Sequence, residues 1–232
     1  MKILALDTAT EACSAALLLD QQLLARELEP GRGQADRILT LVDELLRAAG
    51  VSLGELDAIA FGRGPGGFTG VRLAASVTQG LAFGAGVPVV PVSDLQALAQ
   101  RVFSEDAACT GVIVCNDARM QEVYWGCFER GTDGLAHTVS EERVGAPATV
   151  MLPGSWSGAI AGAGRGFAAY PQLRSRIGDR LATIRDELLP RAHEIAVLAA
   201  PVVRSGGALP AEQALPVYVR NEVAQAPKAS GK

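Results

Sequence analysis

The spacing of apolar residues changes repeatedly along the chain, and the order of these changes limits the fold more than any other feature. Short apolar runs typical of strands alternate with stretches in which apolar residues recur at three- and four-residue steps, as in amphipathic helices. In the first half, strands are expected at 2–7, 13–19, 23–28, 56–61 and 87–92, and helices at 34–49, 69–83 and 94–101. This order, β-β-β-α-β-α-β-α, predicts an α/β fold with a mixed sheet.

The second half predicts a similar order of elements. Strands are expected at 111–115, 122–128, 135–140, 158–162 and 181–185, and helices at 146–152, after the glycine turn of 162–166, and at 190–204. Pro201 is expected to kink or break the last helix. Two consecutive βββαβα-type units predict two lobes, 1–103 and 104–225, followed by a Pro/Ser/Lys/Gly-rich tail, 226–232, that is expected to be disordered.

Size and charge exclude several classes of protein. The 232 residues carry 21 basic and 25 acidic side chains, a net charge of −4, whereas a strongly basic nucleic-acid binder has the opposite balance. No apolar run approaches the ~18 residues that cross a bilayer. The N-terminus reaches Asp7 too early for the apolar core of a signal peptide. We therefore expect a soluble cytoplasmic protein.

Residues for metal binding and nucleophilic catalysis are scarce. The chain has four cysteines without a C-x-x-C pair, and two histidines, His137 and His193, far apart in the sequence. This pattern argues against zinc sites, disulfides and His-based catalysis. We predict no catalytic residue, no metal and no cofactor.

The segment Gly62-Arg63-Gly64-Pro65-Gly66-Gly67 follows a predicted strand and matches the dinucleotide fingerprint G-x-G-x-x-G. However, Pro65 lacks a backbone N–H, and Asp94 lies 27 residues past Gly67, beyond the roughly 20 expected for a ribose contact. We therefore favour a structural loop with positive-φ glycines, and keep a dinucleotide-dependent enzyme as an alternative.

In this structural interpretation, Phe68 pins the loop to the core, Thr69 caps the following helix and Arg72 binds loop carbonyls. The residues of the structural loop are Gly62, Gly64, Pro65, Gly66, Phe68, Thr69, Gly70 and Arg72.

An acidic residue follows the first strand of each half. These residues are Asp7, with Thr8 beside it, and Asp117. In two-lobed folds built from such units the corresponding turns meet in a cleft, where kinases and chaperones use acids to position nucleotide phosphates, although a fold alone does not assign a function. Asp7, Thr8 and Asp117 are therefore vestigial phosphate-loop candidates. An active nucleotide-dependent phosphotransferase is the corresponding alternative function.

The first two predicted helices are candidates for a protein–protein interface. The helix at 34–49 has an apolar stripe wider than one face, which suggests a second burial partner. The helix at 69–83 is rich in small residues, which let another helix approach closely. The predicted interface residues are Ile38, Leu41, Val42, Leu45, Ala74, Ala75, Thr78 and Leu81.

Four blocks that together span nearly the whole chain resemble the bacterial TsaB family, also known as YeaZ. They are residues 1–14, 62–72, 117–124 and 216–221. The resemblance implies the two-lobed actin-like/Hsp70-like ATPase fold (ASKHA, RNase H-like). It also implies a non-catalytic subunit that pairs with its paralogue TsaD in the N6-threonylcarbamoylation of adenosine 37 in ANN-decoding tRNAs.

The same resemblance implies further partners. The ATPase TsaE joins the assembly, TsaC-type enzymes supply threonylcarbamoyl-adenylate, and the chain forms a homodimer when TsaD is absent. Contact with tRNA is expected to be indirect only.

Four positions bear on how far the resemblance extends. Asp94 and Leu98 stand where the catalytic paralogue has a His-x-x-x-His pair that holds a metal. Leucine cannot bind a metal, which supports a non-catalytic role. Gly67 and Gln34 stand where the family usually has Ser and His, so polar contacts of relatives at these two positions are not carried over.

Overall fold

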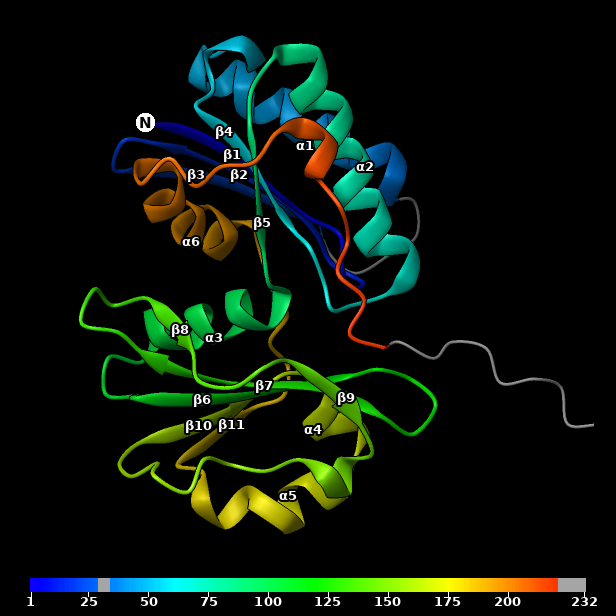
Figure 1. Cartoon of the computed structure of the whole chain (residues 1–232), viewed down its shortest axis with the longest axis vertical. Coiled ribbons are helices and arrows are strands. Elements are labelled where there is room, and N and C mark those ends of the chain that lie inside the picture. The colour runs from blue at the N-terminus through cyan, green and yellow to red at the C-terminus, as the bar shows by residue number, and fades with distance from the viewer. Residues whose placement is uncertain (29–33, 221–232) are drawn as a thin grey trace, which may run out of the picture.

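Two β-sheets, each covered by helices on both faces, organise the chain (Figure 1). The computed structural model describes residues 1–28 and 34–220. The first half contains β1 (Lys2–Asp7), β2 (Cys13–Leu19), β3 (Gln22–Leu28), α1 (Gln34–Ala49), the 3₁₀ turn η1 (Leu53–Glu55), β4 (Ala58–Gly62), α2 (Phe68–Ala85), β5 (Val89–Val92) and α3 (Asp94–Glu105). Sheet order is β3-β2-β1-β4-β5, with β1, β4 and β5 parallel.

The second half repeats this plan. It contains β6 (Gly111–Asp117), β7 (Val123–Arg130), β8 (Ala136–Thr138), β9 (Arg143–Gly145), η2 (Pro147–Thr149), β10 (Ile160–Ala163), α4 (Gly166–Ala169), α5 (Pro171–Ile177), η3 (Gly178–Arg180), β11 (Thr183–Arg185), α6 (Ala192–Arg204) and η4 (Ala211–Gln213). The sheet order β11-β10-β6-β7-β8 matches that of the first sheet, with β9 added beside β7. The predicted α/β class with two related units is therefore confirmed.

Two sequence predictions in the second half are wrong. Residues 146–152 form no α-helix: η2 alone is helical there, because Pro153 disfavours a helical backbone at the residue before it and lacks the N–H that would continue a helix. Helix α6 does not break at Pro201 but continues to Arg204, since buried side chains such as Ile195 and Ala199 hold it against the sheet. The strand β9 was not predicted, and the proposed tail, 226–232, lies outside the described residues.

The last helix of each half packs on the sheet of the other half. Helix α3 contacts β6, β7, β8 and β10 of the second sheet, whereas α6 contacts β1, β2, β4 and β5 of the first, and the two helices touch each other. Figure 1 shows α3 and α6 in the layer between the two sheets, with α1 and α2 outside the first sheet and α5 outside the second. The predicted boundary between lobes 1–103 and 104–225 thus separates the strands of the two sheets. It does not separate the helices, because α3 and α6 each cover the sheet of the other half.

Three apolar clusters follow these layers. The middle cluster, around Ile3, Leu98 and Ile195, joins both sheets through α3 and α6. A second cluster lies between the first sheet and α1 and α2, and a third lies under α4 and α5. Strand β1 is apolar from Ile3 to Leu6, because both of its faces are buried in the middle of the first sheet. In the part of the chain that the structure describes, no helix is long and apolar enough to cross a membrane.

The start of α6 contains a buried ion pair and is hydrogen-bonded to the first sheet. Glu194 is 1% exposed, and its two carboxylate oxygens accept hydrogen bonds from Nη2 and Nε of Arg191 at 2.6 and 3.1 Å. The N–H of Ala192 donates to Ser14 Oγ on β2 at 2.9 Å. The start of α6 therefore depends on a charge pair whose acidic member has no access to water.

We predict that Arg191→Met lowers the free energy of unfolding by about 3–5 kcal/mol, because it leaves the Glu194 carboxylate buried and unpaired. Denaturant titration measures this change. The double variant Arg191→Met/Glu194→Leu should recover most of the loss, since no buried charge remains. A single variant within about 1 kcal/mol of the wild type would contradict the assignment.

Candidate functional site

The glycine-rich loop connects β4 to α2 and is held by backbone groups. The N–H of Gly64 donates to Asp94 Oδ2 at 2.5 Å, and the N–H of Asp94 donates back to the Gly64 carbonyl at 3.1 Å. The N–H of Gly67 donates to the carbonyl of Ala9 at 2.7 Å. Within residues 62–67 only Gly64 has a positive φ, +98°, so the expectation of several positive-φ glycines is wrong.

Two further glycines, Gly66 in the loop and Gly70 in the first turn of α2, are required by close approach. A Cβ on Gly66 would lie 2.5 Å from the carbonyl oxygen of Ala9, and a Cβ on Gly70 would overlap the carbonyl oxygen of Thr8. The Thr8 hydroxyl in turn donates to the Gly70 carbonyl at 2.7 Å. The N-terminal turn of α2 therefore rests directly on the backbone that follows β1.

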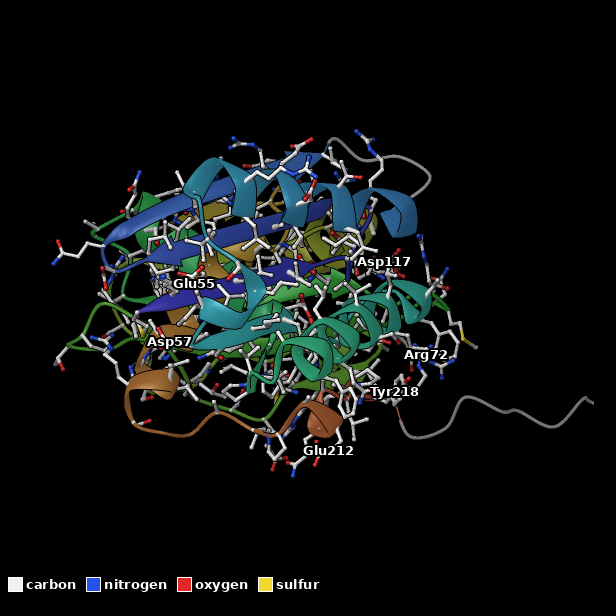
Figure 2. The ribbon with its side chains drawn as sticks, turned by 90° about the horizontal axis from the view of Figure 1, so that it is seen from above. Glu55, Asp57, Arg72, Asp117, Glu212 and Tyr218 are labelled. Atoms are coloured by element: carbon white, nitrogen blue, oxygen red, sulfur yellow. The ribbon has the colours of Figure 1, made fainter. Side chains whose placement is uncertain are left out.

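Three residues beside the loop lie elsewhere than predicted. Phe68 is not pinned to the core but 57% exposed. Thr69 does not cap α2, because the helix already begins at Phe68 and its N-cap is Gly67. Arg72 stacks on Phe68, with Cζ 3.5 Å from the ring centroid, and its Nε donates to the Tyr218 hydroxyl at 2.7 Å (Figure 2).

Arg72 does not bind the loop, and backbone N–H groups engage several of the loop carbonyls. The carbonyl of Arg63 accepts from the N–H of Val217 at 2.8 Å, and that of Gly67 accepts from the N–H of Val71 at 3.0 Å. The side chain of Arg72 turns outward, toward the C-terminal segment.

A cleft of about 990 Å³ opens between the two halves. The cleft is lined by the turn after β1, the glycine loop, the start of α2, the end of β6, Arg165, the end of α4 and residues 217–220. Its charged lining residues are Glu11, Asp117, Arg119, Arg165 and Arg220.

Each charged group of the cleft already has a partner of opposite charge. Arg165 pairs with Glu11 at 2.8 Å across the two halves, and Arg119 pairs with Asp117 at 3.0 Å. Arg220 pairs with Glu122. The cleft therefore presents ion pairs rather than free charges to a ligand.

The structure does not bring the vestigial phosphate-loop candidates together in the cleft. Asp7 and Thr8 are 1% and 0% exposed and lie beneath the cleft, covered by α2. Asp117 lines the cleft, where its Oδ1 accepts hydrogen bonds from the N–H of Arg119 at 2.8 Å and the Tyr170 hydroxyl at 2.9 Å. Asp7 instead faces Asp94. A sequence signal could have revealed this contact: Asp94 comes just after β5, a strand that lies parallel to and beside β4.

The C-terminal segment is part of the site, although the sequence indicated it only as a block typical of the family. Tyr218 contacts Arg72 of the first half. Arg220 donates to the Ala118 carbonyl at 3.2 Å and pairs with Glu122, both in the second half. Residues 217–220 therefore join the two halves along the edge of the cleft.

The turn between β6 and β7 carries the most unusual backbone of the cleft. Arg119, Met120 and Gln121 have φ values of +61°, +54° and +63°. Such left-handed conformations are uncommon for residues other than glycine, and each costs of the order of 1 kcal/mol. Met120 is 70% exposed at this turn. The contacts of Arg220 to Ala118 and Glu122 brace it, and no sequence pattern signalled it.

The predicted interface residues face inward. Ile38, Leu41, Val42, Leu45, Ala74, Ala75 and Thr78 are at most 5% exposed, and Leu81 is half-buried. Most of them pack against the first sheet in the second apolar cluster. The isolated chain therefore does not present these side chains to a partner. The apolar stripe that suggested an interface is used for the chain's own core.

The outward surface of the same helices consists of other residues. We call it the outer helix face and define it as Leu39, Asp43, Arg47, Ser76, Gly80, Phe83 and Gly84, all exposed. Phe83 is 78% exposed and Leu39 49%. A Cβ on Gly80 or on Gly84 would meet nothing within 4 Å, so neither glycine is required by contacts within the described chain.

The chain is similar to known proteins along most of its length. The family model "TsaD: tRNA N6-adenosine threonylcarbamoyltransferase" matches residues 30–219. The tRNA threonylcarbamoyladenosine biosynthesis protein TsaB of Escherichia coli K12 is 41% identical, over 97% of this chain and 96% of that protein. The TsaB protein of Haemophilus influenzae is 38% identical, over 96% and 95%.

Among solved structures, YeaZ from Pseudomonas aeruginosa superposes with a TM-score of 0.84 at 43% identity, covering 94% of this chain and 99% of that one. This similarity, together with the repeated sheet order, confirms the two-lobed ASKHA, RNase H-like fold class.

We predict that alanine lowers the stability of the chain at one glycine of this site, Gly70, but not to the same extent at another, Gly67. Gly70→Ala places a methyl group against the Thr8 carbonyl and should lower the free energy of unfolding by about 1–3 kcal/mol. Gly67→Ala is the matched control, because its Cβ would lie 3.4 Å from the Ala9 carbonyl oxygen, an ordinary contact. Denaturant titration of both variants is the measurement, and equal losses would refute the close-approach argument.

Proposed function

The chain belongs to the TsaB family of tRNA threonylcarbamoyladenosine biosynthesis proteins, and from this premise we propose that it is a non-catalytic subunit that docks a TsaD-type catalytic subunit through the outer helix face. The TsaD model that matches most of the chain makes a structurally related partner reasonable. The same face would form the homodimer in the absence of that partner.

The proposal rests mainly on two glycines in α2, whose cost to the stability of the helix is not explained by contacts within the described chain. A glycine inside a helix destabilises it by about 1 kcal/mol relative to alanine. Gly80 and Gly84 bring no compensating contact within the described chain, and both are exposed. Glycines on a helix surface allow a second helix to approach closely. A partner helix packed here would explain why both positions lack a side chain.

The residues around these glycines have the composition of an interface. Phe83, at 78% exposure, supplies a large apolar side chain next to Gly84, and Leu39 supplies a second one on α1. Aromatic side chains of this kind dominate the binding energy of many interfaces. Asp43 and Arg47 form an exposed ion pair at 3.0 Å on α1, which suits the polar rim of such a surface.

The burial of the phosphate-loop candidates supports a non-catalytic role. A kinase-like reaction needs an acid that reaches the nucleotide, but Asp7 is covered by α2 and Thr8 is hydrogen-bonded to Gly70. The alternative, a nucleotide-dependent phosphotransferase that uses Asp7 and Asp117, therefore has less support. It predicts that the isolated chain binds Mg-ATP in a calorimetric titration, whereas the docking role does not require any heat of binding.

The remaining parts of the proposal follow from the family. The complex with the TsaD-type subunit would recruit the TsaE ATPase and use threonylcarbamoyl-adenylate supplied by TsaC-type enzymes. The acidic balance of this chain, −4, suits a subunit that meets tRNA only indirectly. This role would place the chain in the cytoplasm.

We predict that Gly80→Leu weakens docking at least tenfold, about 1.4 kcal/mol, without destabilising the isolated chain. Leucine is a good helix former, and a Cβ at this exposed position meets nothing within 4 Å, but the side chain would hold a partner helix away. Titration with the TsaD-type subunit measures the affinity, and denaturant titration verifies the fold.

Gln172→Leu is the matched control, because Gln172 is exposed on α5 at the far side of the second sheet. It should bind like the wild type. Unchanged affinity of a folded Gly80→Leu variant would refute docking through the outer helix face.

A further inference from the structure

Two carboxyl groups face each other in the interior beneath the cleft. Asp7 ends β1 and Asp94 begins α3, and their side chains are 1% and 0% exposed. Both crowd Gly62, the last residue of β4: a Cβ there would overlap Asp94 Oδ1 and lie 3.0 Å from Asp7 Oδ1. The three parallel strands β1, β4 and β5 end side by side, which brings these residues to one edge of the sheet.

The hydrogen bonds of this pair account for two of its four oxygens. Asp7 Oδ1 accepts from the N–H of Ala9 at 2.8 Å, and Asp94 Oδ2 accepts from the N–H of Gly64 at 2.5 Å. Asp7 Oδ2 and Asp94 Oδ1 receive no hydrogen from any residue that the structure describes. The two carboxyl groups are nevertheless adjacent, since the position that a Cβ would take on Gly62 lies against both Asp94 Oδ1 and Asp7 Oδ1. If both groups were ionised, no hydrogen atom would lie between them. Each charge would then be buried without a partner, which is energetically costly.

We propose that Asp7 and Asp94 share one proton at neutral pH and form a buried carboxyl–carboxylate site that fastens the glycine loop and the start of α3 to the end of β1. Asp94 carries the proton. Its Oδ1–H donates to Asp7 Oδ2, its carbonyl-like Oδ2 accepts from Gly64, and Asp7 remains the carboxylate that Ala9 stabilises. With this single proton, all four oxygens have a partner.

The surrounding charges favour proton retention. The titratable groups that face the pair are Glu194 on α6, Glu142 between β8 and β9, and Cys13 on β2. Glu194 is neutralised by Arg191, Glu142 by Arg63, and Arg37 acts on Cys13. No cation among the described residues pairs with Asp7 or Asp94 themselves. The charges that act on the pair, Glu194 and Glu142, are therefore negative, and their neutralising cations lie one step further away.

The pKa directions agree with this geometry. Burial raises the pKa of Asp7 to about 6, and the charge of Glu194 adds to that effect. Burial and the negative charge of Asp7 raise the pKa of Asp94 well above its usual range. Burial, followed by the charge of Asp7, raises the pKa of the Cys13 thiol to about 11. The thiol therefore stays protonated and adds no charge near the pair.

The shared proton makes folding pH-dependent in a defined direction. In the unfolded chain both carboxyl groups ionise near their usual pKa of about 3.9, whereas the folded chain keeps a proton at neutral pH. Because the folded state binds more protons, the unfolding equilibrium constant rises with pH, by up to about tenfold per pH unit, until the shared proton leaves. The stability linked to this pair is fully present below pH 4 and is lost as the pH rises through the pKa values of the folded chain.

The variant Asp94→Asn tests this directly. An asparagine amide can donate to Asp7 and accept from Gly64 at every pH, so it replaces the protonated acid. We expect the unfolding constant of the wild type, divided by that of Asp94→Asn, to rise several-fold between pH 6 and pH 9. Asp179→Asn, at an exposed position in η3, should give a constant ratio. A constant ratio for Asp94→Asn as well would overturn the proposal.

A second measurement tests the shared proton even if Asp94→Asn does not fold. Infrared spectroscopy of the wild type at neutral pH should contain the carbonyl band of a protonated carboxyl group, and Asp7→Asn should shift it. Absence of this band would overturn the proposal. Stabilisation of the wild type by Mg²⁺ at pH 9, lost in Asp7→Asn, would likewise overturn it, because the pair would then hold a cation in place of a proton.

Discussion

The backbone of α2 approaches the turn after β1 more closely than any residue with a side chain would permit, and much of the molecule depends on this contact. Gly66 and Gly70 lie against the carbonyls of Ala9 and Thr8. The contact covers the acid at the end of β1, and it fixes the direction of α2 along the outer face of the first sheet. Because Asp7 and Thr8 are buried beneath this contact, neither side chain is exposed to a ligand in the cleft.

The electrostatics of the molecule are consistent with the proposed docking role. The cleft contains ion pairs, among them the pair of Glu11 and Arg165 that joins the two halves, rather than unpaired charges ready for a ligand. Beneath it, Asp7 is engaged with Asp94. On the outer helix face, by contrast, Gly80 and Gly84 lower the stability of α2, and no contact within the described chain explains why these positions lack a side chain.

The sequence predicted most of the strands in their succession along the chain, the two related units and the glycine loop, because these depend on local periodicity and on residues with restricted conformations. It did not predict which face of each helix is exposed. Leu41 and Leu45 of α1 could serve equally well in the chain's own core or in an interface, and only the position of the first sheet decides between them. The contact between Asp7 and Asp94 is likewise a tertiary feature, since β5 comes next to β4 only in the folded sheet. The three left-handed residues at 119–121 had no local signal, because none of them is a glycine.

Hydrogen–deuterium exchange of the chain, alone and mixed with the TsaD-type subunit, tests the central claim most directly, provided that the free chain is measured at a concentration where it is monomeric. The docking role predicts slower exchange on mixing in peptides from α1 and α2, with α4 and α5 unchanged. Slower exchange confined to the second half, or no change in α2 despite complex formation, would contradict it.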